Sequence, residues 1–381
     1  MLTRDDALAP DADDRLSSWR DEFVSPDSSL VYLDGNSLGM MPRRTMKRLF
    51  SVINDEWAVG LIRSWDQWID LPQRVGDRLA PLIGAASGEV AVHDSTTVNL
   101  YQLVDAACSL RPDRRVIAIG PDDFPTDRYV VDGIARARRL SVRNDFDQLD
   151  DVAVMVGSVV DYRSAAVADV AAETARAHAA GAMAVWDLSH AAGVLEIDLH
   201  AAGVQLAVGC TYKYLNGGPG SPAFSFVARD LQATLPQPIW GWFAQANQFG
   251  MGLTFTPQPD IRRVLLGTPS ILALAAAEEG IAVTVEAGIA PIASKARALT
   301  GFGMELCDQF GLHSTTPRDP SRRGGHLAVC HPDAQHLVDK LAERGVATDF
   351  RDPDTVRIGC SPLTTRFTDV FDGLSRLADL V

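Results

Sequence analysis

The chain has 381 residues, more than one simple core usually organises, so two domains are expected. Its 46% apolar and 22% charged residues are ordinary for a globular protein, and no apolar run approaches the roughly 18 residues of a membrane span. With 35 basic and 49 acidic residues the formal net charge is −14, which argues against nucleic acids and anionic membranes as partners.

Cysteine and histidine usage bears on the compartment and on metals. The five cysteines are scattered and never form a C-x-x-C pair, which argues against a disulfide framework and a zinc site. The N-terminus, MLTRDDALAPDADD, is acidic and lacks the apolar segment of a signal peptide. We therefore expect a cytoplasmic protein without a bound metal, since no metal-ligand spacing with cysteines or acids occurs at His313, His326, His331 or His336.

Strand-like apolar runs bounded by turn residues recur along the chain, at 115–120, 152–160, 183–188, 205–212 and 222–228. An alanine-rich stretch typical of a helix, 167–181, separates two of them. Strands and helices that alternate at this spacing predict an α/β fold with a mostly parallel sheet. Prolines then frame a long loop, 236–260, which contains two of the seven tryptophans and is typical of a functional or interfacial segment.

The pattern of predicted elements changes after about residue 270. An alanine-rich helix is predicted at 271–298, followed by short strands at HLAVC and TVRIG and by a terminal helix. We therefore predict a large domain at 31–270 and a smaller α+β C-terminal domain at 271–381, and the N-terminal segment 1–30 is expected to pack with the smaller domain.

Two strand ends carry an acid and a lysine. Asp187 ends the run AVWDLSH, and Lys213 lies on the glycine-rich turn of LAVGCTYKYLNGGPG. In parallel α/β sheets the chemistry lies just beyond such strand ends. A pyridoxal phosphate (PLP) enzyme needs a lysine that forms a Schiff base with the cofactor and a carboxylate that keeps the pyridine nitrogen protonated. The plain alternative is a strand-end lysine that reaches solvent, as we expect of the lysines in helix-like stretches, Lys47, Lys295 and Lys340.

Two further segments suit a PLP site. The segment DSTTVNL (94–100) resembles a helix start, where unpaired backbone amides and hydroxyls can hold a phosphate, or where Ser95 or Thr96 is an ordinary N-cap. In FPTDRY (124–129), Phe124 could stack on the pyridine ring and Asp127 could touch the cofactor. The alternative for this second segment is a core phenylalanine beside an exposed aspartate.

Three other side chains have both a functional and a structural interpretation. His190 could contact Asp187 or the cofactor, or it could be a structural histidine. The Tyr212 hydroxyl could reach the phosphate or move a proton. Arg357, in the apolar run TVRIG, suits a substrate carboxylate or a structural ion pair with Asp349 or Asp352. Hydrolase-triad and dinucleotide-binding motifs are missing from the sequence.

Together these segments resemble kynureninase, a family of fold-type I PLP enzymes, over most of the chain. The matching segments follow in the family's order: VYLDGNSLGMMP, GLIRSWDQWIDLP, DSTTVNL, FPTDRY, VDYRS, WDLSHAAGVLEIDLHAAGVQLAVGCTYKYLNGGPGSPAF, GTPSI and DFRDPDTVRIGCSPL. The resemblance implies a large PLP-binding domain with a mostly parallel sheet and a smaller C-terminal domain. It also implies hydrolysis of the Cβ–Cγ bond of L-kynurenine to anthranilate and L-alanine in tryptophan degradation.

The resemblance also implies roles for individual residues. Lys213 is the Schiff-base lysine and general base, Asp187 is the partner of the pyridine nitrogen, and Tyr212 is a candidate for proton transfer to water or to the leaving carbon. The cofactor contacts are Thr96, Thr97, Phe124, Asp127, Ser158, His190, Tyr212, Trp242 and Thr268. The substrate contacts are Ser37, Trp65, Gly267, Thr268 and Arg357. In the family the site lies at a homodimer interface, and the segments of Trp242 and Thr268 come from the neighbouring subunit.

The chain departs from the family pattern at three positions. Thr364 stands where a tyrosine is usual, and Ser164 and Ala165 stand where threonine and glycine are usual. Trp65 and the residues at 267–268 resemble an apolar bacterial pocket, which favours L-kynurenine over its 3-hydroxy form, although an apolar pocket rejects an added hydroxyl only modestly. The departures leave open a biosynthetic paralogue that acts on a ring-substituted kynurenine.

Two alternatives lie outside this activity. A cysteine desulfurase needs a mobile cysteine of low pKa, whereas Cys330 and Cys360 lie beside strand-like runs. A non-catalytic binding module on the same fold would have no reason to keep Lys213, Asp187 and Arg357 together.

Overall fold

The central element is a seven-stranded sheet within residues 1–25, 27 and 29–381, which the computed structural model describes. Its strand order is β2 (Val90–His93), β8 (Ala223–Val227), β7 (Leu206–Gly209), β6 (Met183–Asp187), β5 (Val152–Ser158), β3 (Val116–Ile119) and β4 (Ser141–Arg143). Neighbouring strands from β7 to β4 pair in parallel, and β8 is antiparallel to both of its neighbours. The predicted mostly parallel α/β sheet and its five strands are therefore confirmed.

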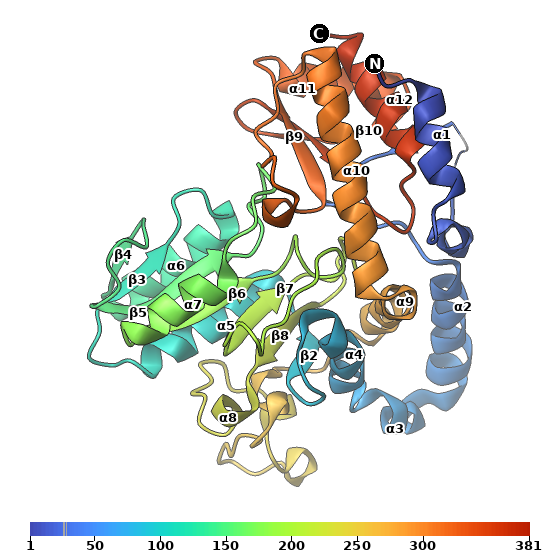
Figure 1. The fold of residues 1–381 in the computed structure, drawn as a ribbon. Coiled ribbons are helices and arrows are strands. Elements are labelled where there is room, and N and C mark those ends of the chain that lie inside the picture. The colour runs from blue at the N-terminus through green and yellow to red at the C-terminus, as the bar shows by residue number, and fades with distance from the viewer. Residues whose placement is uncertain (26, 28) are drawn as a thin grey trace.

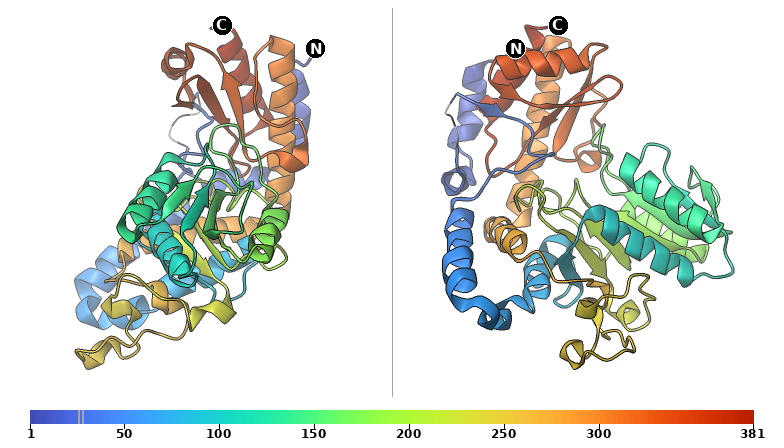
Figure 2. Two further views of the ribbon diagram at one scale, coloured as in Figure 1. Left: turned by 90° about the vertical axis from the view of Figure 1, so that its left-hand side faces the viewer. Right: turned by 180° about the vertical axis from the view of Figure 1, so that it is seen from behind.

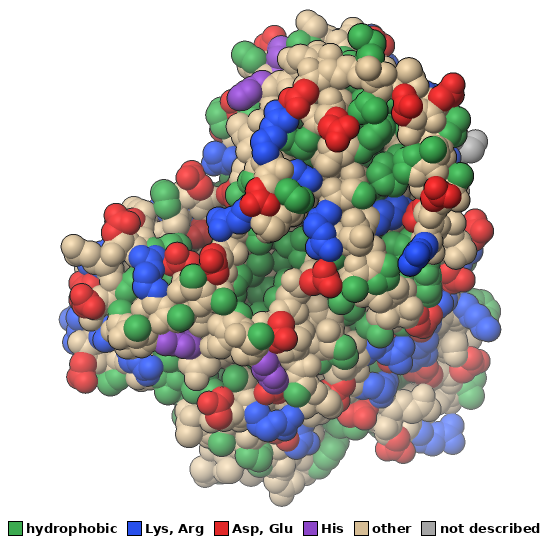
Figure 3. Space-filling model, viewed as in Figure 1, with side chains coloured by type: hydrophobic (Ala, Val, Ile, Leu, Met, Phe, Trp, Pro, Cys, Tyr) green, Lys and Arg blue, Asp and Glu red, His purple; other side chains and the backbone are tan. Residues whose placement is uncertain are grey.

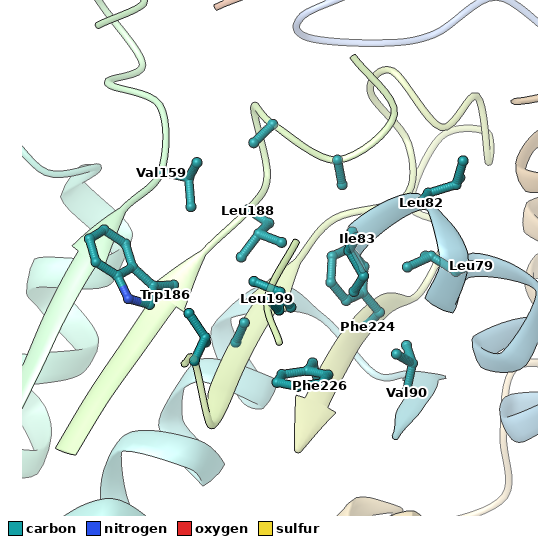
Figure 4. Packing of buried hydrophobic residues seen from close by; sticks show 14 of the residues in the cluster. Leu79, Leu82, Ile83, Val90, Val159, Trp186, Leu188, Leu199, Phe224 and Phe226 are labelled. Carbon is teal, nitrogen blue, oxygen red and sulfur yellow. The ribbon is translucent and has the colours of Figure 1, made fainter. Parts of the chain in front are cut away.

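Helices cover both faces of this sheet (Figure 1). One face packs on α5 (Thr96–Ser109) and α6 (Pro125–Arg138). The other packs on α4 (Leu71–Leu79), α7 (Val170–Ala179) and α9 (Ile271–Ala287). Figure 4 shows Trp186, Phe224 and Phe226 of β6 and β8 on this second face. Because successive strand residues point to opposite faces, Asp187 is free to face the strand-end cavity rather than this core.

The segment predicted as one helix at 271–298 is two helices. α9 ends at Ala287, and α10 runs over Ile289–Phe310. Gly288 between them has a φ of +84°, outside the helical region, so the chain changes direction there. The single-helix prediction was wrong because alanine-rich composition continues across this one left-handed residue. In Figure 1, α10 runs on from the large sheet to the second, smaller sheet.

The smaller sheet has the order β11 (Asp349–Arg351), β12 (Thr355–Gly359) and β9 (His326–Cys330), all antiparallel. It packs with α10, α11 (Ala334–Glu343) and α12 (Phe367–Ala378) around a separate core. The predicted strands at HLAVC and TVRIG and the terminal helix are confirmed.

The N-terminal segment lies against this smaller part of the molecule. Helix α1 (Arg4–Ala12) packs beside α12, and Asp11 accepts hydrogen bonds from the backbone N–H groups of Phe367 and Thr368 at 2.7 and 3.1 Å. Strand β1 (Val31–Tyr32) pairs in parallel with β10 (Val346–Ala347). The two termini consequently lie at the same end of the molecule (Figures 1 and 2).

The remaining helical segments are short or lie at the periphery. They are η1 (Ser17–Glu22), α2 (Arg43–Ser51), the π-helix η2 (Val52–Gly60), η3 (Leu61–Ser64), α3 (Trp65–Trp68), η4 (Ala80–Ile83), α8 (Arg229–Gln232), η5 (Trp242–Ala244), η6 (Gln248–Gly250), η7 (Ile261–Val264) and η8 (Pro320–Arg322). The described helices include none that combines the length and apolar character needed to cross a bilayer. On the face drawn in Figure 3, basic and acidic side chains are interspersed.

Candidate active site

Lys213 lies at the base of a cavity at the carboxyl ends of the central strands. Its backbone turns directly after β7, where Gly217 N–H donates to Thr211 at 2.8 Å and Asn216 N–H donates to Lys213 at 2.9 Å. The side chain is 9% exposed, so the alternative of a lysine that reaches solvent is wrong. The cavity has a volume of about 250 Å³ and is lined by Asp94, Ser95, Thr96, Thr97, Phe124, Thr126, Asp127, Asp187, Ser189, His190, Tyr212, Lys213, Gly220 and Ser221.

Two buried carboxyl groups meet in this cavity. Asp187 is the last residue of β6, and its Oδ1 accepts hydrogen bonds from the backbone N–H and the hydroxyl of Ser189 at 2.8 and 2.6 Å. Asp127, in the first turn of α6, hydrogen-bonds to Asp187. Burial raises the pKa of both carboxyls, and the charge of Asp187 raises that of Asp127 further. Asp127 is only 3% exposed, so the expected alternative of an exposed Asp127 is wrong.

His190 connects Lys213 to Arg357. Its Nε2 lies 3.1 Å from Lys213 Nζ and 3.4 Å from Arg357 Nη1. Both neighbours are donors, so Nε2 is the acceptor and the ring proton resides on Nδ1. Burial and the charge of Lys213 hold the pKa of His190 well below its usual value, and burial lowers the pKa of Lys213. A neutral amine at Lys213 is thereby favoured, which is the form that attacks an aldehyde.

The opposite end of the cavity is formed by the start of α5. Ser95 is its N-cap, accepting weakly from Val98 N–H at 3.4 Å, so the expected N-cap is Ser95 rather than Thr96. Thr96 and Thr97 follow as the first helical residues and line the cavity. First-turn N–H groups lack helical partners, and the helix dipole favours an anion there. The N-cap and the phosphate cradle are therefore compatible features of one segment.

Two aromatic rings flank the lysine. Lys213 Nζ lies 5.9 Å from the centre of the Phe124 ring and 5.8 Å from that of Tyr212. Phe124 also packs edge-on against Tyr162 at 5.2 Å, which fixes its plane. Burial raises the pKa of Tyr212, so its hydroxyl keeps its proton at neutral pH and acts there as a donor.

The donor set of this cavity fits PLP. A buried amine suits the aldehyde, the buried carboxyl of Asp187 suits the pyridine nitrogen, and a flat ring at Phe124 suits the pyridine face. The start of α5 and the hydroxyls of Thr96 and Thr97 suit the phosphate.

Arg357 and Ser37 lie next to the cavity rather than in its lining. Arg357, 1% exposed in the middle of β12, pairs with Asp349, so the ion-pair alternative is confirmed with Asp349 as the partner. Its Nη2 also donates to Ser37 Oγ at 2.9 Å, and its Nη1 faces His190. The guanidinium thus forms a structural ion pair with Asp349 and is linked to Lys213 through His190.

Five residues with expected contacts do not line this cavity. Ser158 lies opposite Asp187 in the β5–β6 register, and its N–H donates to Asp123 Oδ1 at 3.0 Å. The rings of Trp65 and Trp242 pack against each other with centres 6.2 Å apart, and Gly267 and Thr268 are exposed. The expected contacts of these five residues therefore stay predictions.

Sequence reasoning missed several polar residues of the site. Ser189 orients Asp187, and Thr126 and Ser221 line the cavity. Ser189 had a readable signal, because a hydroxyl two residues after an aspartate at a strand end commonly bonds back to it. Asp123 had none for its contact with β5: its bond to the Gly120 N–H is local, but its bond to the Ser158 N–H joins segments 35 residues apart.

The departures from the family pattern lie outside the cavity. Ala165 has a φ of +63° with its methyl group fully buried, a conformation that favours the usual glycine, and its carbonyl accepts from Gly324 N–H at 2.8 Å. Thr364 lines a different cavity of about 310 Å³, with Arg20, Phe23, Tyr32 and Met40 among its other walls. Neither change removes a group from the Lys213 cavity.

Comparison with known proteins identifies the family. Residues 292–377 match the model of the kynureninase C-terminal domain. Over its whole length the chain is 42% identical to the kynureninases of Pseudomonas fluorescens and Burkholderia pseudomallei strain K96243, covering 96% of each. The chain belongs to the kynureninase family. Membership confirms the resemblance, the PLP cofactor and the class of enzyme, a PLP-dependent hydrolase of a carbon–carbon bond.

Solved structures confirm the fold class. The cysteine desulfurase of Thermococcus onnurineus NA1 superposes with a TM-score of 0.81 at 16% identity, covering 92% of this chain and 94% of that one. The cysteine desulfurase CsdA of Escherichia coli gives 0.79 at 17% identity, covering 96% and 98%. At such identities the likeness concerns the fold alone. The desulfurase alternative is not supported by the sequence relatives, and burial raises the pKa of Cys108, Cys210, Cys307 and Cys360.

The pKa of Asp34 gives the kynureninase chain a measurable pH dependence. Burial and the charge of Asp349 raise the pKa of Asp34 to about 6, and its buried Oδ1 has no hydrogen-bond partner in the described structure. The folded state therefore binds this proton more tightly than the unfolded state, and stability is lost as pH rises from about 4 to 6. We expect Asp34→Asn to raise the free energy of unfolding at pH 8 by about 2 kcal/mol and to change it little at pH 4. Denaturant titrations at both pH values measure this, and an equal change at both would contradict it.

Proposed function

We propose that this kynureninase hydrolyses L-kynurenine to anthranilate and L-alanine, with the residue roles given below. The observation that carries the proposal is the arrangement around His190, whose Nε2 lies within 3.4 Å of both Lys213 Nζ and Arg357 Nη1. An amine that can exchange with the substrate amine therefore lies one side chain away from a cation that suits the substrate α-carboxylate. The shared strand-end cavity with Asp187 and the start of α5 supports the same proposal.

PLP, when bound, supplies an aldehyde that links to amines and a ring that accepts electron density. Lys213 holds the cofactor and, once displaced by the substrate amine, removes the substrate α-proton as a general base. Burial lowers the pKa of Lys213, which favours the neutral amine, the form that accepts a proton. Asp187, oriented by Ser189 and backed by Asp127, holds the proton on the pyridine nitrogen.

Water addition to the substrate γ-carbonyl needs groups that move protons. Tyr212 lines the cavity with its ring centre 5.8 Å from Lys213 Nζ, and burial raises the pKa of its hydroxyl, so Tyr212 is the candidate that donates a proton to the leaving carbon. Phe124, packed edge-on against Tyr162, lines the same cavity with its ring centre 5.9 Å from Lys213 Nζ.

The test is a turnover assay with the purified protein loaded with PLP. L-Kynurenine should give anthranilate, detected by its fluorescence, and an equal amount of L-alanine. A PLP-loaded protein with neither product would contradict the proposal. The same assay with 3-hydroxykynurenine addresses the second candidate, a ring-substituted substrate, which is kept because Ala165 and Thr364 depart from the family pattern. We expect L-kynurenine to be preferred by about tenfold, because an apolar ring wall discriminates against a hydroxyl only modestly.

We also propose a cytoplasmic homodimer with shared active sites. Large apolar side chains are exposed on η2, η3 and the loop at 236–260, including Trp57, Ile62, Trp240, Phe249 and Leu253. These segments lie at the same end of the molecule (Figure 2, left), and Trp65 contacts Trp242 across them. An exposed apolar surface of this kind is typical of a protein interface. Gly267 and Thr268, exposed in one chain, would meet the partner's cavity there.

Mixing two inactive variants tests the sharing of sites. Thr268→Glu places a carboxylate where a partner's phosphate would be bound, and Lys213→Ala removes the lysine. If Thr268 acts in the partner's cavity, each mixed dimer has one intact site, and an equimolar mixture regains about a quarter of wild-type activity. Each variant alone should remain inactive. If the mixture stays inactive although mixed dimers form, Thr268 does not act across the interface.

A further inference from the structure

The donors of Arg357 are divided between two directions. On one side, Nε donates to Asp349 Oδ1 at 2.7 Å and Nη2 bonds to Asp349 Oδ2, so the carboxylate grips one edge of the guanidinium. On the other side, Nη2 donates to Ser37 Oγ at 2.9 Å and Nη1 faces His190 Nε2 at 3.4 Å. A second Nη1 hydrogen bond, to the carbonyl of Tyr162 at 2.7 Å, fixes the plane. Nη1 is therefore separated from Lys213 by a single side chain, His190.

The pairing of β11 with β12 places the Asp349 carboxylate beside the Arg357 guanidinium. Asp349 of β11 lies directly opposite Arg357 of β12 in the antiparallel register. Side chains of directly opposed residues emerge on the same face of a sheet, only a few ångströms apart at Cβ. The bond between the two side chains is thus set by two rigid strands rather than by a flexible loop.

Asp349 also binds a second cation. Arg351 Nη2 lies 2.8 Å from Asp349 Oδ2 and 3.5 Å from Ser37 Oγ, and its side chain is 34% exposed. Ser37 Oγ donates to the same carboxylate. Asp349 alone would neutralise Arg357, whereas Arg351 adds a second positive charge beside it. Asp34, whose pKa is raised to about 6, offsets that second charge above this pH.

We propose that Asp349 is a positioning residue for substrate binding: it turns the end of the Arg357 guanidinium toward the cavity, and Arg351 supplies the second positive charge that attracts the substrate α-carboxylate. This inference rests on the proposed role of Arg357. If Asp349 instead competed with the substrate for Arg357, removing its charge would tighten substrate binding. The two relations predict opposite effects of removing the Asp349 charge.

The experiment measures binding of two small amines to the PLP-loaded enzyme through the absorption of bound PLP. L-Alanine has the α-carboxylate, and ethylamine lacks it. In Asp349→Asn we expect L-alanine to bind about 10- to 100-fold more weakly, the usual cost of a lost charge-assisted hydrogen bond, with ethylamine unchanged. Arg351→Gln should weaken L-alanine about tenfold, again without an effect on ethylamine. The matched control is Asp352→Asn, an exposed carboxylate in the same hairpin, which should change neither.

Unchanged or tighter L-alanine binding in Asp349→Asn would overturn the positioning role, and unchanged binding in Arg351→Gln would overturn the role of the second cation. If Asp349→Asn does not fold, Asp349→Glu replaces it. The longer side chain keeps the charge but moves the carboxylate relative to the Arg357 guanidinium. Binding of L-alanine should then weaken, and binding of ethylamine should stay unchanged. Equal binding of both amines by the wild type would instead contradict the proposed role of Arg357. A wild type that produces no anthranilate would contradict the proposed function, whatever the binding ratio.

Discussion

Lys213→Ala should lower the turnover of L-kynurenine by more than about 1,000-fold, because one substitution removes both the covalent holder of the cofactor and the general base. The other described lysines cannot replace it. Lys47 and Lys340 lie on outer helices, and Lys295 is buried in an ion pair with Asp14 at 2.7 Å. The measurements are anthranilate production and the visible absorption band of bound PLP, and both should be lost together.

The control for this variant is Lys340→Ala. Lys340 pairs with Glu343 at 2.9 Å on the exposed side of α11, so its removal costs little stability and should leave turnover unchanged. An unchanged PLP band and turnover in Lys213→Ala would contradict the assignment of the lysine. A folded Lys213→Ala protein is expected, since the cavity around a shortened side chain can admit water.

Asp187→Asn should lower kcat by about 100-fold or more while the protein still folds. The amide keeps the size of the side chain and can still accept from the N–H and hydroxyl of Ser189. It loses the negative charge that holds a proton on the pyridine nitrogen. The measurements are kcat and the position of the absorption band of bound PLP, which should shift because the ring loses its proton.

Asp127→Asn is the matched comparison for Asp187→Asn. Both carboxyls are buried, and they hydrogen-bond to each other, but only Asp187 is oriented by Ser189. We therefore expect a smaller loss of kcat in Asp127→Asn, in which Asp187 keeps its charge. A larger loss in Asp127→Asn would make Asp127 the principal partner of the ring.

Much of the site was predictable because its residues follow strand ends. Asp187 and Lys213 end neighbouring parallel strands, and the carboxyl ends of such strands meet at one edge of the sheet. The start of α5 was readable from its hydroxyls for a similar local reason. The proposed domain boundaries stay predictions.

Other features were not readable in advance. The break at Gly288 was hidden by a continuous alanine-rich composition, because one left-handed residue leaves no trace in the periodicity around it. The separation of Trp65, Trp242 and Thr268 from the cavity of their own chain depends on how the loop at 236–260 folds, which neither spacing nor composition fixes.

By itself, the sequence determined the family and the α/β class, and it predicted the cofactor lysine and its acidic partner, because each is encoded by a short run of neighbouring residues. Only the tertiary structure decided that His190 accepts from both Lys213 and Arg357, that Asp127 hydrogen-bonds to Asp187, and that Asp349 rather than Asp352 pairs with Arg357. These pairings join segments up to 167 residues apart. Their geometry follows from strand register and helix packing, which depend on the whole core rather than on any local run of residues.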